Sequence, residues 1–171
     1  MTVEARYCPR CSAPLSHVPP VVCGACGYAL WVNPRPTGTV IIVEDERFLA
    51  LKRARPPRVG WWDLPGGFCD GYELPADAAV REAREELGIR VRLDTFVGMY
   101  IGRYHYQDEL LPVLDCFWLA SIVEGEIRLD SDEGTEFGWL PLREPPAMAF
   151  ATMDLALADA LSCLDSSTAG K

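Results

Sequence analysis

The stretch GFCDGYELPADAAVREAREELGI, residues 67–89, predicts a helix with one acidic face. Pro75 suits the first helical turn and Gly88 suits the position after the last turn, so we expect the helix to span Pro75–Leu87. At about 100° per residue, three carboxylates fall within one arc of about 100°. These are Glu82, Glu85 and Glu86, beside an apolar arc that holds Ala76, Ala79, Val80, Ala83 and Leu87.

Three carboxylates at positions i, i+3 and i+4 repel one another and disfavour the helix. Mg²⁺ or Mn²⁺, which prefer oxygen ligands, would turn that repulsion into metal binding. An isolated E-x-x-E-E could equally be a solvated stripe that pairs with nearby arginines. The residues around the helix therefore decide between the two interpretations.

Those residues resemble the Nudix box, in which G is followed by five residues, E, seven residues and R-E-U-x-E-E-x-G-U, where U is a bulky aliphatic. The matching positions are Gly67, Glu73, Arg81, Glu82, Glu85, Glu86, Gly88 and Ile89. Ala83 is smaller than the usual aliphatic, which affects helix packing and not the chemistry. Residues 62–68, WDLPGGF, also resemble the entry to this box.

The resemblance implies a role for each matching residue. Glu82, Glu85, Glu86 and the carbonyl of Gly67 would bind Mg²⁺ or Mn²⁺. The catalytic set would be Glu85, Glu86, Arg81 and Glu73, with Arg81 aiming a carboxylate through an ion pair. In family enzymes water attacks a phosphorus of a P–O–P linkage, and the metal lowers the pKa of that water. The general base could be a box glutamate or a later acid, Glu133 or Glu136, although both could also lie in a solvated turn.

A second motif consists of two C-x-x-C pairs, Cys8–Cys11 and Cys23–Cys26, separated by 11 residues. Four thiolates at this spacing are typical of a tetrahedral Zn²⁺ site, and a closed site of this kind is structural. A redox dithiol is the alternative, but it would need only one pair. The segment resembles the small ribbon of NADH pyrophosphatases and of some ADP-ribose pyrophosphatases. Its role could be dimerisation, partner docking or stabilisation.

The chain of 171 residues therefore divides into a zinc ribbon with its linker, residues 1–36, and a Nudix hydrolase domain, residues 37–171. Mixed strands and helices indicate an α+β fold, and the resemblance implies a Nudix α/β/α sandwich with a mixed sheet. Residues 33–36, NPRP, are expected to be an extended linker. Strands are expected at residues 39–43, 48–53, 61–64, 90–98, 99–106, 113–123 and 137–140, and Pro65-Gly66-Gly67 is expected to end the third of them. A last helix would run from Thr152 or Asp154 to about Leu164.

The substrate is less well defined than the reaction. The resemblance favours hydrolysis of a nucleoside diphosphate linked to another group, with ADP-ribose first and FAD or NADH next. The Ser-Gln-Pro-Trp-Pro-Phe-Pro type signature of NADH pyrophosphatases is missing after the box, which makes NADH a weaker substrate candidate. Arg53 and Arg58 could bind phosphate oxygens, Tyr104 could stack on a base or ribose, and Glu136 could contact the ligand. Each of them could instead lie in the core or on the solvated surface.

Composition restricts location and partners. The formal net charge is −9, whereas generic nucleic-acid binders are usually basic, so a nucleic-acid partner is not expected. No apolar run approaches the roughly 18 residues of a membrane span, and the first ten residues do not read as a signal peptide. We therefore expect a cytoplasmic protein, with a homodimer suggested by the resemblance. The remaining cysteines, Cys69, Cys116 and Cys163, are expected to be buried.

Three other functions remain open from the sequence. A nucleoside triphosphate pyrophosphohydrolase would use the same residues. A non-catalytic nucleotide-binding regulator would share the fold, but such proteins usually lose box glutamates and this chain keeps all of them. RNA decapping or general RNA binding is disfavoured by the negative charge and the lack of a basic stripe.

Overall fold

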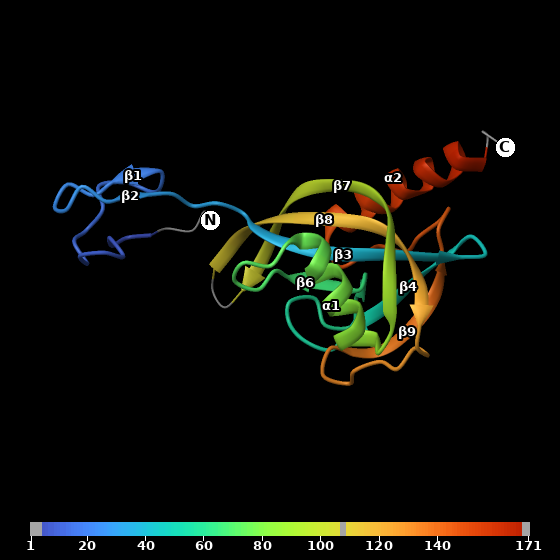
Figure 1. Cartoon of the computed structure of the whole chain (residues 1–171). Helices are drawn as coiled ribbons and strands as arrows, with labels where there is room; N and C mark the ends of the chain where they lie inside the picture. The colour runs from blue at the N-terminus through green and yellow to red at the C-terminus, as the bar shows by residue number, and fades with distance from the viewer. Residues whose placement is uncertain (1–4, 107–108, 169–171) are drawn as a thin grey trace.

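A computed structural model of the chain describes residues 5–106 and 109–168, and its N-terminal ribbon is followed by a larger unit of sheets and helices (Figure 1). The ribbon holds β1 (Val21–Val22) and β2 (Ala29–Leu30). The larger unit holds β3 (Arg35–Glu44), β4 (Arg47–Arg53), β5 (Trp62–Asp63), β6 (Gly66–Phe68), α1 (Pro75–Leu87), β7 (Arg90–Tyr106), β8 (Glu109–Glu124), β9 (Gly134–Pro141) and α2 (Ala151–Thr168).

Strand β3 is the centre of the main sheet. It pairs in parallel with β8 and antiparallel with β6, and β8 continues antiparallel into β7. A tight hairpin joins the end of β3 to β4, where Val43 lies opposite Phe48. Strand β4 then pairs antiparallel with β5 and β9. The sheet is therefore mixed, as the sequence predicted.

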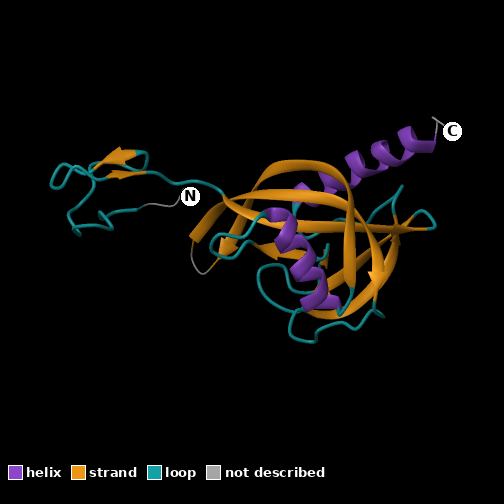
Figure 2. Ribbon diagram, viewed as in Figure 1, coloured by secondary structure: helices purple, strands orange, loops and turns teal. Residues whose placement is uncertain are grey.

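Alternate residues of β3 face two different cores, because successive side chains of a strand point to opposite faces of the sheet. Val40 and Ile42 pack in the cluster that contains Ala79, Ala83 and Leu87 of α1. Ile41 packs in the cluster that contains Met153, Ala156, Leu157 and Ala160 of α2. One helix thus covers each face, which confirms the predicted α/β/α sandwich (Figure 2).

Helix α1 has the predicted bounds, Pro75–Leu87. Gly88 ends it in the left-handed conformation, with φ of 68°, and its N–H donates to the carbonyl of Arg84. At its other end, α1 lies against Gly38 of β3, where an added Cβ would be 1.9 Å from the carbonyl oxygen of Pro75. A glycine at this position lets the helix approach the sheet closely.

Several boundaries differ from those expected. Strand β5 ends at Asp63, before Pro65, as expected, but Gly66 and Gly67 then belong to a further strand, β6, because they pair with Thr39 and Gly38 of β3. Residues 90–106 form one long strand, β7, which accommodates register shifts within it. The linker is shorter than expected, since Arg35 already pairs with Val113 in β8. Helix α2 begins one residue before Thr152 and ends beyond Leu164.

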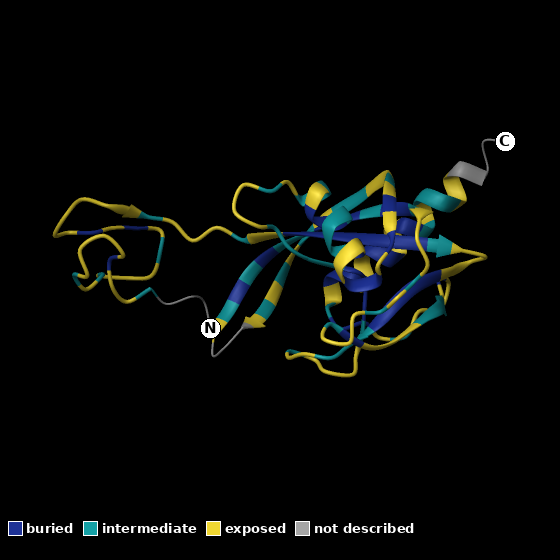
Figure 3. Cartoon of the chain, turned by 60° about the horizontal axis from the view of Figure 1, so that its bottom comes forward, coloured by how far each residue is buried: buried dark blue, intermediate teal, exposed yellow. Residues whose placement is uncertain are grey.

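Burial follows this architecture (Figure 3). Strands β3 and β4 and the inner faces of the two helices are buried, whereas the ribbon is mostly exposed. Cys116 is buried as expected, but Cys69 and Cys163 are only half-buried, so the expectation for those two was wrong. Among the described residues, no helix is both long and apolar enough to cross a membrane.

Candidate functional site

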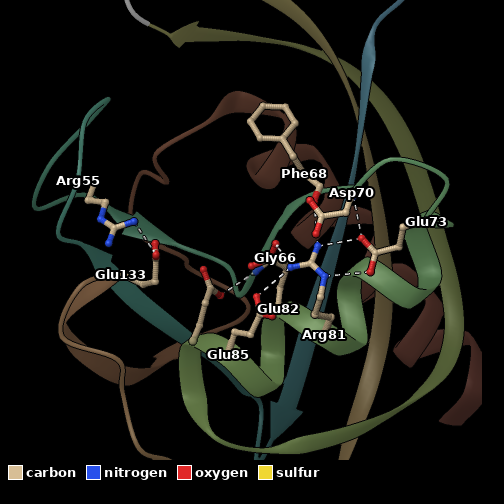
Figure 4. Close-up of polar contacts among 10 residues, drawn as sticks. Arg55, Gly66, Phe68, Asp70, Glu73, Arg81, Glu82, Glu85 and Glu133 are labelled. Atoms are coloured by element: carbon tan, nitrogen blue, oxygen red, sulfur yellow. Dashed lines mark hydrogen bonds and ion pairs between the residues drawn. The ribbon is translucent and has the colours of Figure 1, made fainter.

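Arg81 of α1 is the centre of a polar network (Figure 4). Its guanidinium binds Glu73 bidentately, with both N···O distances at 2.9 Å, and donates to Glu82 at 2.7 Å and Glu85 at 2.9 Å. It also donates to the carbonyl of Phe68 at 3.0 Å. One arginine therefore ties the loop before α1 and strand β6 to the acidic face of the helix.

Glu73 is held firmly in its ionised form. The Arg81 hydrogen bonds, together with the backbone N–H of Asp70, lower the pKa of Glu73 to about 2. Glu73 lies in the loop just before α1, so this ion pair fixes the approach of the loop to the helix. The sequence-based expectation gave Arg81 this orienting role.

Glu82 and Glu86 lie on the face of α1 that meets the glycine strand β6. Glu86 is only 8% exposed, and its carboxylate accepts the N–H of Gly66 at 3.0 Å. A Cβ on Gly67 would be 2.3 Å from a carboxylate oxygen of Glu82, so only glycine lets the backbone come this close. Burial raises the pKa of Glu82, and burial together with the charges of Asp63 and Glu82 raises the pKa of Glu86 well above its usual range.

A cavity of about 800 Å³ lies beside these carboxylates, and Glu82, Glu86 and Gly67 line it. Glu85 does not line it, since this side chain is 58% exposed and pairs with Arg81. The structure therefore brings two of the three expected metal-binding carboxylates to the cavity. The third lies next to them on the outside of the helix.

The cavity also contains three of the four residues expected to bind substrate: Arg53, Arg58 and Tyr104. Arg53 forms an ion pair with Asp63, and its guanidinium lies 5.2 Å from the ring centroid of Phe150. Burial alone would lower the pKa of Arg53. The charge of the Asp63 carboxylate and its hydrogen bond together raise the pKa of Arg53. The arginine is thus a fixed cation in the cavity wall.

Aromatic rings stand next to that cation. Tyr104 packs edge-on against Phe68, with centroids 5.3 Å apart, and lies 5.5 Å from the ring of Phe150. Arg58 is more exposed and stacks over Trp61 at 4.8 Å. Cationic and aromatic groups together are suited to the phosphate and ring parts of a nucleotide.

The two later acids have different positions. Glu133 lines the cavity and accepts a hydrogen bond from Arg55 at 2.8 Å. Glu136 lies on β9, pairs with Lys52 at 2.6 Å, and is not part of the cavity lining. Of the two, Glu133 is therefore the one that the structure brings to the site.

Asp115 is a cavity residue to which the sequence pattern does not point. It lies within β8, and its two carboxylate oxygens accept the hydroxyls of Thr37 at 2.8 Å and Thr152 at 2.7 Å. Burial raises the pKa of Asp115, and the two threonine hydrogen bonds oppose this shift. The only signal available in the sequence is a carboxylate inside an otherwise apolar strand pattern.

The four ribbon cysteines come together as the spacing predicted. The sulfurs of Cys8, Cys11, Cys23 and Cys26 all lie within 4.8 Å of one another. Within residues 5–106 and 109–168, this is the one group of three or more potential metal ligands drawn together so tightly. Gly27 and Ser12 take left-handed conformations after the two knuckles, with φ of 70° and 59°. Backbone N–H groups of Cys26 and Ala25 lower the pKa of Cys23 to about 7, whereas contacts with the other three thiols raise the pKa of Cys11 to about 12.

Known proteins are similar to this chain in sequence and in fold. A family model described as the NUDIX domain matches residues 33–159. An ADP-ribose pyrophosphatase from Methanocaldococcus jannaschii is 29% identical over 123 residues, which cover 72% of this chain and 71% of that protein. A MutT NUDIX hydrolase structure from Burkholderia pseudomallei superposes with a TM-score of 0.65 at 31% identity, covering 74% of this chain and 98% of that one.

Two further relatives match over only about half of their own length. A CMP-5'-(N-acetyl-N-hydroxy-3-aminopropyl)phosphonate hydrolase from Streptomyces rubellomurinus is 47% identical over 119 residues, covering 64% of this chain and 53% of that protein. An NAD-capped RNA hydrolase NudC from Pseudomonas fluorescens is 28% identical over 150 residues, covering 85% of this chain and 51% of that protein. Since the family model spans most of the chain and includes the whole of the box, this chain belongs to the Nudix family and is a pyrophosphohydrolase.

Proposed function

We propose that the protein hydrolyses the pyrophosphate bond of a nucleoside diphosphate linked to a second group and releases a nucleoside monophosphate. ADP-ribose is the first candidate, followed by FAD and NADH. The observation that carries the proposal is the composition of the cavity, which places Glu82 and Glu86 together with Arg53 and Tyr104. A volume of about 800 Å³ is in the range of sites that hold a whole small-molecule ligand.

The acidic face is suited to a divalent cation, Mg²⁺ or Mn²⁺. Glu82 and Glu86 are close to each other and largely desolvated, and no ion pair involving Glu86 is seen among the described residues. Burial raises the pKa of both carboxylates. Oxygen-bound Mg²⁺ or Mn²⁺ would supply the positive charge that keeps them ionised there. Glu82, Glu86 and the Gly67 carbonyl would hold the metal, joined by Glu85 after a rotation away from Arg81. When bound, the metal would lower the pKa of an attacking water and offset the charge that develops on phosphate.

The remaining side chains divide the work of binding and proton transfer. Arg53 presents a fixed charge to phosphate oxygens, while Arg58 reaches the same cavity from a more exposed position. Arg81 orients Glu82 and Glu85 and takes no proton. Glu133 lines the cavity and is a candidate for the general base alongside the box glutamates. Tyr104 and Phe150 offer aromatic surface to a base or ribose.

Two other substrate classes are supported by relatives. The phosphonate hydrolase acts, by its name, on a CMP derivative, which adds CMP-linked compounds to the candidates after ADP-ribose, FAD and NADH. The NAD-capped RNA hydrolases keep an RNA end within the range of substrates, although the net charge of −9 disfavours long RNA. In both cases the bond cleaved would lie next to a nucleoside monophosphate.

The test is a product-release assay on the purified full chain with Mg²⁺ or Mn²⁺. The panel holds ADP-ribose, FAD, NADH, a CDP-linked compound, an NAD-capped oligonucleotide and nucleoside triphosphates. Metal-dependent release of a nucleoside monophosphate from a diphosphate compound supports the proposal. Turnover of triphosphates alone would identify a nucleoside triphosphate pyrophosphohydrolase instead. No turnover of any compound would support a non-catalytic nucleotide-binding regulator.

We also propose that Cys8, Cys11, Cys23 and Cys26 bind one structural Zn²⁺. The mutual distances of their sulfurs support a single tetrahedral site with no open position. The boundary between ribbon and hydrolase domain, at residues 36 and 37, is part of the same proposal. Among the residues that the structure describes, no member of either core cluster precedes Val40, which supports a ribbon that folds around its own metal.

A further inference from the structure

Asp115 stands apart from the other acids of the cavity. Three elements fix it, since it belongs to β8, Thr37 belongs to β3, and Thr152 belongs to the first turn of α2. Both threonines are nearly buried, at 8% and 5% exposure. A Cβ on Gly102 of β7 would lie 2.7 Å from a carboxylate oxygen of Asp115, so the neighbouring strand leaves room for the carboxylate only because it has glycine there.

Within residues 5–106 and 109–168, no cation neutralises Asp115. Among the described residues, Asp115 forms no ion pair, and its hydrogen-bond donors are the two threonine hydroxyls. Several lining residues near Asp115 or its partner Thr152 in the sequence are apolar: Val113 and Phe117 of β8, and Met153 of α2. An anion is therefore repelled here, and the phosphates of a ligand are directed to the arginines elsewhere in the cavity.

A carboxylate in an apolar surrounding instead favours an N–H donor on the ligand. Each carboxylate oxygen has lone pairs left after it accepts one threonine hydroxyl. A hydrogen bond to an ionised group that is shielded from water is among the stronger ones. A ligand that cannot donate at this point would leave the buried carboxylate without that partner. The uncharged end of a nucleotide that carries such donors is the base.

We infer that Asp115 is a specificity-determining residue that accepts a hydrogen bond from the exocyclic amino group of an adenine or cytosine ring. This inference rests on the proposed function, which places a nucleoside diphosphate derivative in the cavity. Hypoxanthine and uracil carry a carbonyl oxygen where adenine and cytosine carry the amino group. The lone pairs of that oxygen would face the carboxylate, so the oxo bases are rejected.

A purely structural role for Asp115 makes a different prediction. The two threonine bonds join α2 to the sheet, so loss of the carboxylate would lower stability whether or not a base is present. That role would not change the preference between an amino base and its oxo counterpart. The ratio of two affinities measured on the same variant therefore separates the two roles.

The experiment is isothermal titration of the full chain, in Mg²⁺, with ADP against IDP and with CDP against UDP. The variant is Asp115→Asn, whose amide can donate to a carbonyl oxygen as well as accept. The matched control is Asp159→Asn, which alters an acid on α2 that bonds Tyr100 outside the cavity. We expect about a 10-fold or larger preference for the amino member of at least one pair in the wild type and the control, and a preference below about threefold in Asp115→Asn.

A thermal melt by circular dichroism accompanies each titration. If Asp115→Asn does not fold, Thr37→Val leaves the carboxylate in place but removes one of its donors, and the preference should fall by an intermediate amount. Equal affinities within both pairs for the wild type, no binding of any of the four, or an unchanged preference in the variants would overturn the inference. The titration measures affinity and the release assay measures product, so failure of this inference and failure of the proposed hydrolysis give different results.

Discussion

Glu86 combines two properties that rarely occur together on a helix surface. It is almost fully buried and it lies beside other acids, so its ionised form needs a positive partner. Replacing Glu86 or Glu85 with glutamine keeps the size of the side chain and removes one charge. We expect each change to lower kcat by about 100-fold or more, as the loss of a metal ligand or base does.

Steady-state rates with the preferred substrate of the panel measure this effect. Glu144→Gln, an exposed acid outside the cavity lining, is the matched control and should keep the wild-type rate. Near-normal turnover in both Glu85→Gln and Glu86→Gln would show that the acidic face of α1 is not the catalytic centre.

Arg81 affects the same chemistry indirectly. Its planar guanidinium binds Glu73 through two nitrogens and also reaches Glu82 and Glu85, a geometry that lysine cannot reproduce. We expect Arg81→Lys to lower kcat/KM by about 10- to 100-fold, as other outer-shell ligand partners do. Arg84→Lys, on the exposed side of the same helix, should change it by less than about twofold. Equal rates for the two variants would remove the orienting role.

Single site residues differ in how well they can be predicted from the sequence. The box glutamates can be predicted because their spacing along one helix sets their common face. Asp115 cannot, since its partners Thr37 and Thr152 are 78 and 37 residues away in the chain. Glu85 is expected from its place on the helix to bind metal with Glu82 and Glu86, yet in the structure it pairs with Arg81 and does not line the cavity. Helical spacing predicts which side chains share a face, but it does not predict whether Glu85 pairs with an arginine or binds a metal.

At the scale of elements, the contact between β3 and α1 positions the site. Helix α1 can lie against the sheet only where β3 lacks a side chain, at Gly38. In Gly38→Ala the new methyl would lie 1.9 Å from the Pro75 carbonyl oxygen and 2.6 Å from the Ala79 nitrogen, so the helix must move. We expect a loss of about 2 kcal/mol or more in the free energy of unfolding, at the upper part of the range for overpacking.

Urea unfolding followed by tryptophan fluorescence measures this loss. Gly24→Ala in the ribbon is the matched control, because nothing lies within 4 Å of its added Cβ. Its unfolding midpoint should match that of the wild type. An unchanged midpoint for Gly38→Ala would mean that the helix and strand are not as close as the structure has them.

The element boundaries show which local signals are decisive. Pro75 and Gly88 marked both ends of α1, because the backbone conformations they favour are local. Gly66 and Gly67 were expected only to end the preceding strand, because glycine favours turns. They form β6 only because β3 offers a pairing edge that lies about 30 residues earlier in the chain.

At the scale of the whole molecule, the proposed ribbon and the proposed hydrolase domain differ in what would stabilise them. The hydrolase domain has two apolar cores on either side of its sheet, and the described ribbon has exposed apolar side chains such as Tyr7 and Trp31. A segment this small needs a staple, and its backbone hydrogen bonds at Cys8 and Cys23 are made within the ribbon. The sequence alone predicts this division, because the spacing of paired cysteines is a local signal of a metal site and does not depend on tertiary contacts.

Removal of one zinc ligand tests whether the two parts are independent. We expect wild-type protein to contain one zinc per chain by elemental analysis and Cys23→Ser to lose it, because three thiolates leave the site open. Hydrogen exchange should then rise within residues 5–30 and stay unchanged in β3 and α1, whose contacts lie in the other core. Hydrolysis should remain within about twofold of the wild-type rate, since none of the described ribbon residues lines the cavity. Cys163→Ser, which alters a half-buried thiol on α2, should keep the zinc. A Cys23→Ser protein whose hydrolase domain also exchanges faster would instead show that the ribbon stabilises the domain that carries the site.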